Sequence, residues 1–369
     1  MAQRLRAGIV GTGLIAVKKH IPAFLKNREQ VELAAICDVN RETAAAVARR
    51  HGIPHAYGDL GEMLMREKLD FVNICTPPKT HAAVAMQVIS HGSHVLIEKP
   101  MAVSLEECDE IIKASQENGV SVCVAHTDLF YPPFLKAKEM VDRGEIGEFL
   151  GMRIFISTPT GYMTSREDHW ANRLRGGVIG ETGPHIVYMT LAFMNHVVEV
   201  HAHGVKLLPY SWSPYEDYRV EFIGERTVCS AASIYSTPQW SAEVDLFGSK
   251  GILKMDLETM SLVKCERAEL SPIRVALSGL REAAQGLQGV VMTAGQVLAG
   301  RYQNTHDLLI GKFASSIRSG SPPPVSAEEG KEAVRVMDML VQSLSLHDAR
   351  RVVGASKGGD SKDNGRSRD

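Results

Sequence analysis

The sequence begins with a glycine-rich segment whose spacing suits the binding of a dinucleotide. Residues 11–16, GTGLIA, match the pattern G-x-G-x-x-G/A between an apolar run and an expected helix. In such a turn Gly11 permits the tight bend, Gly13 lets a pyrophosphate approach the backbone, and Ala16 lets the helix pack on the strand. The N–H groups at the helix start would bind the phosphates. We therefore expect cofactor contacts from Gly11, Thr12, Gly13, Leu14 and Ile15.

An acidic residue follows at the distance where the ribose of such a cofactor is usually bound. Asp38 ends the second apolar run, and its carboxylate could accept the ribose hydroxyls and repel a 2′-phosphate. Arg41, three residues further on, could instead bind such a phosphate. The two residues predict NAD as the cofactor and leave NADP open. A glycine turn without a ligand is the alternative, and the position of Asp38 argues against it.

A glutamate, a lysine and a proline end another apolar run, HVLIEKP, at residues 94–100. Ligands bind at the carboxyl ends of the strands in a parallel sheet, so Lys99 is expected to face the reacting centre, with Glu98 beside the cofactor. Successive side chains of a strand point to opposite faces, which separates the Glu98 and Lys99 side chains. A surface ion pair is the alternative. A cis Lys99–Pro100 bond is also open, because X-Pro bonds adopt cis at modest cost.

The apolar run before this one ends in CTPPKTH, residues 75–81. Pro77 and Pro78 stop that strand at the same edge of the sheet. Thr76, Pro77 and His81 are therefore expected near the cofactor. For His81 the plainer alternative is a position in the first turn of a helix, without a ligand.

A second catalytic candidate lies in GGVIGETGPH, residues 176–185. Pro184 suits the first position of a helix, which would put His185 in the first turn. The positive end of a helix disfavours an imidazolium, so His185 would stay neutral and able to accept a proton. His185 is thus a candidate general base. Packing of this histidine at an interdomain helix start is the alternative.

The elements that must position these residues alternate between apolar runs and helix-period segments over the first 126 residues. The runs are continuous, as expected for strands buried on both faces. They are Leu5 to Val10, Val31 to Cys37, Phe71 to Thr76, Val95 to Ile97, and Val122 to Ala125. Asn40 and Gly52 mark the ends of one helix, and Ser104 and Gly119 those of another. The pattern predicts an α/β, Rossmann-type, doubly wound parallel sheet.

The second part of the chain has a different pattern. From about residue 149, strand-like stretches are separated by Gly, Pro and Ser, which predicts an antiparallel sheet. Residues 271–300 predict a helix with several glycines, interrupted by charged and polar side chains, which we interpret as a packing segment or a partner-facing one. A last amphipathic helix is expected from about Ala327 to Leu346.

The motifs GTGLIA, TPPKTH, EKP and GGVIGETGPH together resemble those of the Gfo/Idh/MocA oxidoreductases, the glucose-fructose oxidoreductase and inositol dehydrogenase group. The resemblance extends to about residue 348. It implies a Rossmann domain over residues 1–126 and an α+β domain with an open, mainly antiparallel sheet over 127–350, which binds substrate and forms a homo-oligomer, a dimer or a tetramer. It also implies hydride transfer between NAD(P) and a secondary alcohol or ketone of a sugar, polyol or sugar derivative. Residues 351–369 are expected to be a disordered tail.

The resemblance also implies residues that surround the substrate. Glu181 stands where the family often has an aspartate that binds substrate, and Tyr188 where it often has an acid. HTDLFYPP, from His126, lacks an arginine often found before its phenylalanine, and Trp170 could stack on a sugar. We expect Lys99 and His185 to be catalytic, and the substrate to contact Glu181, His126, Trp170 and Tyr188. Two alternatives stay open: an enzyme that retains NAD during glycoside cleavage, elimination or epimerisation, and a non-enzymatic dinucleotide-responsive binding protein.

Composition excludes several other classes of protein. The chain has 369 residues, 44% of them hydrophobic, and a formal net charge of -2 with both signs mixed, so neither nucleic acid nor a membrane is an expected partner. The six cysteines stand far apart without a C-x-x-C pair, which indicates reduced core residues and a cytoplasmic location. His201 and His203 lack a third ligand at a recognisable spacing, so no metal is expected.

Overall fold

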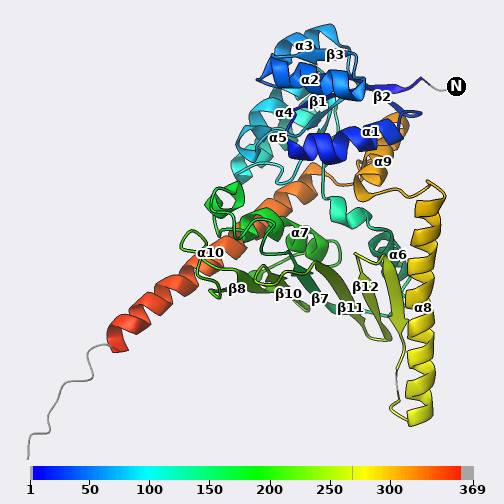
Figure 1. Cartoon of the computed structure of the whole chain (residues 1–369), viewed down its shortest axis with the longest axis vertical. Helices are drawn as coiled ribbons and strands as arrows, with labels where there is room; N and C mark the ends of the chain where they lie inside the picture. Colours follow the sequence, from blue (N-terminus) through cyan, green and yellow to red (C-terminus); the bar gives the residue numbers. More distant parts are fainter. Residues whose placement is uncertain (1–2, 268, 359–369) are drawn as a thin grey trace, which may run out of the picture.

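The computed structural model describes residues 3–267 and 269–358. Its first domain contains a six-stranded parallel sheet with the order β3-β2-β1-β4-β5-β6. The strands are β1 (Leu5–Val10), β2 (Val31–Cys37), β3 (His55–Tyr57), β4 (Phe71–Ile74), β5 (His94–Ile97) and β6 (Val122–Val124). Most of their side chains are buried because helices cover both faces of the sheet (Figure 1). The predicted doubly wound Rossmann-type sheet is confirmed.

The helices of this domain begin and end largely where the sequence indicated. They are a π-helical turn (Ala16–His20) that continues into α1 (Ile21–Lys26), α2 (Arg41–His51), α3 (Leu60–Arg66), α4 (His81–Ser90) and α5 (Leu105–Asn118). The Asn40 side chain caps α2, and Gly52 ends it in the left-handed conformation. Ser104 and Gly119 do the same for α5. These caps fix the helices that surround the cofactor edge of the sheet.

The second domain contains a seven-stranded sheet with the order β13-β12-β11-β7-β10-β9-β8. The strands are β7 (Phe149–Ser157), β8 (Glu199–Val205), β9 (Asp217–Ile223), β10 (Val228–Ile234), β11 (Ser241–Gly248), β12 (Gly251–Asp256) and β13 (Ser261–Cys265). Strands β7 and β10 pair in parallel, and the other pairs are antiparallel. Burial alternates along β8 and β9, because one face is covered and the other is open. The expected open, mainly antiparallel sheet is confirmed.

Helices α6 (Pro132–Asp142), α7 (Ile179–Leu191) and α10 (Ala327–Gly358) lie on the covered face of this sheet (Figure 1). Helix α8 (Pro272–Leu298) stands at the β13 edge, and α9 (Thr305–Ser319) returns to the first domain, where it packs on α1. Helix α7 of the second domain therefore lies at the junction between the domains, and α9 brings the chain back across this junction to pack on α1.

Two helix boundaries differ from expectation. Helix α7 begins at Ile179, so Pro184 lies inside the helix and the expected start at Pro184 is wrong. The reason is the pair Gly176 and Gly177, whose positive φ values of 80° and 74° form the turn from which the helix starts earlier. Helix α10 continues to Gly358, beyond the expected end near Leu346. Of the expected disordered tail, residues 359–369 lie outside the described residues.

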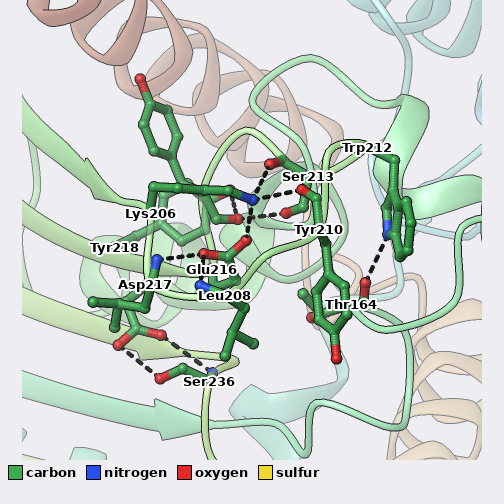
Figure 2. A network of polar contacts seen from close by, with 12 residues as sticks. Thr164, Lys206, Leu208, Tyr210, Trp212, Ser213, Glu216, Asp217, Tyr218 and Ser236 are labelled. Carbon is green, nitrogen blue, oxygen red and sulfur yellow. Dashed lines mark hydrogen bonds and ion pairs between the residues drawn. The ribbon is translucent and has the colours of Figure 1, made fainter.

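An ion pair between Lys206 and the buried Glu216 braces the loop between β8 and β9 (Figure 2). The fully buried carboxylate of Glu216 lies 2.6 Å from Nζ of Lys206 and accepts two backbone N–H groups of the loop, at 2.7 and 3.0 Å. The Tyr218 hydroxyl donates to the carbonyl of Gly176 at 2.8 Å. The loop therefore supports the glycine turn from which α7 begins.

All six cysteines are buried and unpaired, as their spacing indicated. Among residues 3–267 and 269–358, no helix combines the length and the apolar character that a membrane crossing requires.

Candidate active site

The glycine-rich turn leaves open backbone at the carboxyl end of β1. Gly11 has a φ of 92°, and a Cβ there would lie 2.7 Å from the Cys75 carbonyl oxygen, so the turn requires glycine. A Cβ on Gly13 would meet nothing within 4 Å, which leaves room for a phosphate beside the backbone. Leu14 and Ile15 follow in the first helical residues and are exposed. The turn thus fits the pyrophosphate of a dinucleotide.

Asp38 lies beside this turn as a charged carboxylate. Its Oδ2 accepts the backbone N–H and the hydroxyl of Thr12 at 2.8 and 2.6 Å, and its Oδ1 accepts the Asn40 N–H at 2.9 Å. Burial would raise the pKa of Asp38, but these hydrogen bonds lower it below its ordinary value. Arg41 is exposed at the start of α2. A charged Asp38 opposes a 2′-phosphate, in agreement with the preference for NAD that we inferred from the sequence.

The loops after β4 and β5 are joined by His81. Its Nδ1 lies 2.8 Å from the Pro100 carbonyl oxygen, and its Nε2 lies 2.8 Å from that of Thr76. Burial lowers the pKa of His81, and a neutral imidazole donates only one hydrogen bond, so its single proton serves one carbonyl at a time. Thr76 and Pro77 stay at the surface of this edge. His81 therefore positions the loops and is itself covered.

Lys99 links the end of β5 to the start of α7. Its Nζ lies 3.0 Å from Oε1 of Glu181 and donates to the Glu181 carbonyl at 2.8 Å. The Lys99 side chain is only 11% exposed, so the surface ion pair considered above is excluded. The Lys99–Pro100 bond is cis. Because β5 belongs to the first domain and α7 to the second, this pair lies at the junction of the two domains.

Glu98 points away from Lys99, as the alternation along a strand predicts. Its Oε1 lies 2.6 Å from Nε2 of His20, and its Oε2 accepts the Lys99 backbone N–H at 3.1 Å. The His306 ring of α9 packs edge-on against His20, with ring centroids 5.0 Å apart. Burial would raise the pKa of Glu98, but His20 lowers it to about 2. We expected Glu98 to contact the cofactor, and the structure places its carboxylate in a buried ion pair behind the loop.

His20 carries the positive charge of this pair. Burial disfavours an imidazolium, yet Cys75 and Glu98 raise the pKa of His20 to about 10. Because burial raises the pKa of Cys75 and keeps it a neutral thiol, we attribute the charge on His20 to the Glu98 carboxylate. In the structure the Asn73 side chain points its Nδ2 at Nδ1 of His20, 2.7 Å away, and its Oδ1 has no hydrogen-bond partner. Turning that amide gives the second imidazolium proton an acceptor.

The same cluster has donor atoms at a spacing that a metal ion could bridge. Ligand atoms of His20, Glu98 and His306 lie within 4.8 Å of one another. His20 is the cation of the ion pair with Glu98, so a metal would have to displace its proton in order to bind there. We therefore interpret the cluster as an ion pair that anchors α9 and the π-helical turn behind Lys99.

His185 is held by a carboxylate that the sequence analysis did not identify. Asp128, in the 3-10 turn Thr127–Phe130 after β6, has its Oδ2 2.7 Å from Nδ1 of His185. The Tyr188 hydroxyl lies 2.6 Å from the same nitrogen. Burial would raise the pKa of Asp128, but its interaction with His185 lowers it, so Asp128 is ionised. Asp128 follows β6 at the same sheet edge as Lys99, and that position is the signal that could have identified it.

The position of His185 changes the reason why it can act as a base. Since α7 begins at Ile179, His185 lies in the middle of the helix, and our argument from the helix start is wrong. Instead, the Asp128 carboxylate accepts Nδ1–H, which fixes the tautomer with the lone pair on Nε2. Among the described residues Nε2 has no hydrogen-bond partner, and the side chain is partly exposed. His185 thus presents a basic nitrogen at the junction of the domains.

Lys99 and His185 share one side of α7. Glu181 and His185 are four residues apart on this helix, so they lie on one face, one turn from each other. Lys99 is bound to Glu181, and Lys99 and His185 both contribute to the lowered pKa of Asp128. The ammonium group and the imidazole are therefore neighbours, contributed by different domains.

The other expected substrate residues divide into two pairs. His126 and Tyr188 are buried and stacked on each other, with centroids 4.4 Å apart, and burial followed by His185 lowers the pKa of His126 to about 3. They lie behind His185, so we reassign them from substrate contact to support of that ring. Glu181 and Trp170 remain accessible, and Trp170 is 49% exposed.

A Rossmann domain with an open glycine turn, followed by a sheet domain whose histidine lies at the junction of the two domains, is the arrangement expected of a nicotinamide-dependent dehydrogenase. Residues 5–126 match the model of the oxidoreductase family with a NAD-binding Rossmann fold, and residues 134–254 match that of the GFO/IDH/MocA C-terminal domain. The chain belongs to the Gfo/Idh/MocA family of oxidoreductases. The matching relatives are named oxidoreductases and dehydrogenases, which favours an enzyme over the non-enzymatic binding protein that the sequence had left open.

Relatives and solved structures agree with this assignment. Oxidoreductase P35 of Formosa agariphila is 29% identical over 205 residues, which cover 54% of this chain and 64%, less than two thirds, of that protein. Myo-inositol 2-dehydrogenase of Thermotoga maritima is 25% identical over 338 residues, 89% of this chain and 93% of that protein. A levoglucosan dehydrogenase solved with NADH and levoglucosan shares the fold, with a TM-score of 0.76, 18% identity, and coverage of 93% and 97% of the two chains.

Proposed function

We propose that this enzyme transfers hydride between NAD and a secondary alcohol of a sugar, polyol or sugar derivative. The observation that carries the proposal is the pairing of Lys99 and His185 on one side of α7, beside the cofactor edge of the Rossmann sheet. The relatives named for myo-inositol and levoglucosan support a polyhydroxylated substrate. The exposed Trp170 is suited to stacking on the apolar face of a sugar ring.

Each polar group has a distinct role in this reaction. Nε2 of His185 accepts the hydroxyl proton of the substrate, and the Asp128 carboxylate stabilises the imidazolium that forms. The Lys99 ammonium stabilises the negative charge that develops on the substrate oxygen. Glu181 holds Lys99 in place and accepts a hydrogen bond from a second substrate hydroxyl.

The cofactor would be held by the glycine turn from Gly11 to Ile15, by Asp38 and by the surface at Thr76 and Pro77. Bound NAD supplies the hydride acceptor, so the substrate carbon loses its hydrogen with both electrons and becomes a ketone. The hydroxyl proton of the substrate stays on His185 until it passes to water, so the alcohol has lost one hydride and one proton in total. The charged Asp38 favours NAD over NADP.

The proposal is tested with a panel of inositols, sugars and sugar acids, followed by nicotinamide absorbance and by product analysis. We expect Lys99→Met and His185→Asn to lower turnover by about 100-fold or more, because each removes a group that acts in the transition state. NAD affinity should change little. Lys113→Met, at an exposed position on α5, is the matched control.

Two results would count against the proposed roles. Weakened NAD binding with unchanged turnover in the Lys99→Met enzyme would reject the role of its ammonium group. Products that form without net NADH would identify the alternative in which the enzyme retains the cofactor through a cleavage, elimination or epimerisation.

A further inference from the structure

Helix α8 attaches to its own domain through its polar side. The Gln285 side-chain amide pairs with the Lys264 backbone as a neighbouring strand would. Its Oε1 accepts the Lys264 N–H at 2.9 Å, and its Nε2 donates to the Lys264 carbonyl at 3.4 Å. Glu282 pairs with Arg267 at 2.7 Å. Gly289 packs closely, because a Cβ there would lie 2.9 Å from Cα of Ser261. The side of α8 that faces β13 is therefore made of amide, charged and small residues.

Helix α8 stands at the edge of the second domain (Figure 1), and its side opposite to β13 is apolar and exposed. A surface helix normally turns its apolar side toward the core, and α8 does the reverse. No residue of α8 is buried. The large apolar residues on the outer side are between 50% and 89% exposed: Ile273, Leu277, Leu280, Leu287, Val291 and Leu298.

The outer side has the repeat of a helix that pairs with another helix. Steps of four and three residues alternate along it without interruption, which is the spacing of a coiled-coil seam. The seam consists of Ile273, Leu277, Leu280, Ala284, Leu287, Val291, Ala294 and Leu298. Such a repeat calls for a helical partner of similar length.

We propose that α8 pairs with α8 of a second copy of this chain. The two helices run antiparallel, and the two-fold axis that relates them crosses α8 at the level between residues 285 and 286. In this register each alanine of the seam faces a leucine of the other helix. The layers are Ile273 with Leu298, Leu277 with Ala294, Leu280 with Val291, and Ala284 with Leu287. A parallel pair would instead put alanine opposite alanine in two layers and leave voids, which close packing disfavours. The seam is thus complementary to itself in the antiparallel direction.

Charge and area agree with this pairing. Arg274 and Arg281 flank the seam, and the antiparallel register brings them nearest to Gly295 and Gln288 of the second copy, without like charges in contact. At roughly 100 Å² for each of the six large side chains, two copies would bury about 1,200 Å², the lower end of the range for specific dimers. The second copy of α8 is therefore a sufficient partner.

Sedimentation of the full-length protein tests the surface. We expect the wild type to sediment as a dimer or a multiple of it, and the double variant Leu280→Glu/Leu287→Glu to sediment at half that mass. Gln296→Glu, on the other side of α8, is the matched control and should keep the wild-type mass. NAD binding by each variant reports that the Rossmann domain is folded. A wild-type monomer, or a double variant with unchanged mass, would overturn the proposal.

Disulfide trapping tests the direction. Leu277→Cys and Ala294→Cys proteins, mixed and oxidised, should form the mixed dimer, because these positions face each other only in the antiparallel pair. In a parallel pair they would lie about 26 Å apart, and each variant would cross-link with itself. The buried native cysteines keep the background low. Cross-linking of each variant with itself would show a parallel pair and refute the proposed direction. Binding of a monomeric wild type to phosphatidylcholine vesicles would show that lipid covers this surface and would refute the proposed dimer.

Discussion

The buried pair between Glu98 and His20 should contribute strongly to stability, and Glu98→Gln measures that contribution. Glu98 is 8% exposed, so solvent screens the pair little. Lowering the pKa of Glu98 from 4.5 to about 2 corresponds to about 3 kcal/mol. The glutamine keeps the shape of the side chain and leaves the His20 imidazolium buried without a counter-charge. We expect the free energy of unfolding to fall by about 3 kcal/mol near pH 6.

The pH dependence of this loss follows from the two pKa shifts. The lowered pKa of Glu98 stabilises the fold above pH 4.5, and that contribution is lost as the pH falls toward 2. The raised pKa of His20 stabilises it below pH 6.5, and that contribution is lost as the pH rises toward 10. The difference between wild type and Glu98→Gln should therefore be largest between pH 4.5 and 6.5 and shrink as the pH rises.

Urea unfolding followed by far-ultraviolet circular dichroism at pH 6, 7.5 and 9 measures these differences. Glu117→Gln, on an exposed part of α5, is the matched control and should change stability little. In His20→Gln the additional Glu98→Gln change should cost much less, since the pair is already broken. A loss in Glu98→Gln below about 1 kcal/mol at pH 6, or one that is equal at all three pH values, would refute the charged pair.

Three further outcomes are expected. Asp128→Asn should lower turnover by about 100-fold or more in steady-state kinetics, because the tautomer of His185 is no longer fixed, while NAD affinity measured by calorimetry stays near wild type. Gly13→Val should weaken NAD binding at least about tenfold and leave the melting temperature of the free protein unchanged, since its side chain enters only the space left for the phosphate. Glu216→Gln should lower the free energy of unfolding by about 2 kcal/mol, because it breaks the buried pair with Lys206, whose own side chain is partly exposed. Normal turnover in Asp128→Asn would contradict the first expectation, and normal NAD affinity in Gly13→Val would contradict the second. Unchanged stability in Glu216→Gln would contradict the third.

The sequence predicted the first domain well because its signals are local. Continuous apolar runs marked β1, β2, β4, β5 and β6, and Asn40 with Gly52 marked the ends of α2. The positive φ and close backbone contact of Gly11 are what the glycine pattern requires. The parallel pairing of β7 with β10 was not predictable, because strand-like stretches alone do not specify which strands meet.

The partners of the site residues were the part that sequence reasoning missed. Asp128 binds a histidine 57 residues away, and Glu98 binds His20, 78 residues away, from a π-helical turn. Such contacts depend on how the strand ends converge, which spacing along the chain does not give. For α7, the preference of proline for the first helical position was overridden by the glycine turn at residues 176–177, which starts the helix earlier.

The amide of Gln285 has a consequence for how the second sheet ends. Strand β13 is an outermost strand, and a bare strand at that place offers unpaired N–H and C=O groups to any other extended chain. The Gln285 amide binds the backbone N–H and C=O of Lys264, as a further strand would do. Unlike a strand, it offers no new N–H and C=O groups with which another chain could pair. The Gln285 side chain thus blocks this position of β13 against pairing with a strand of another molecule.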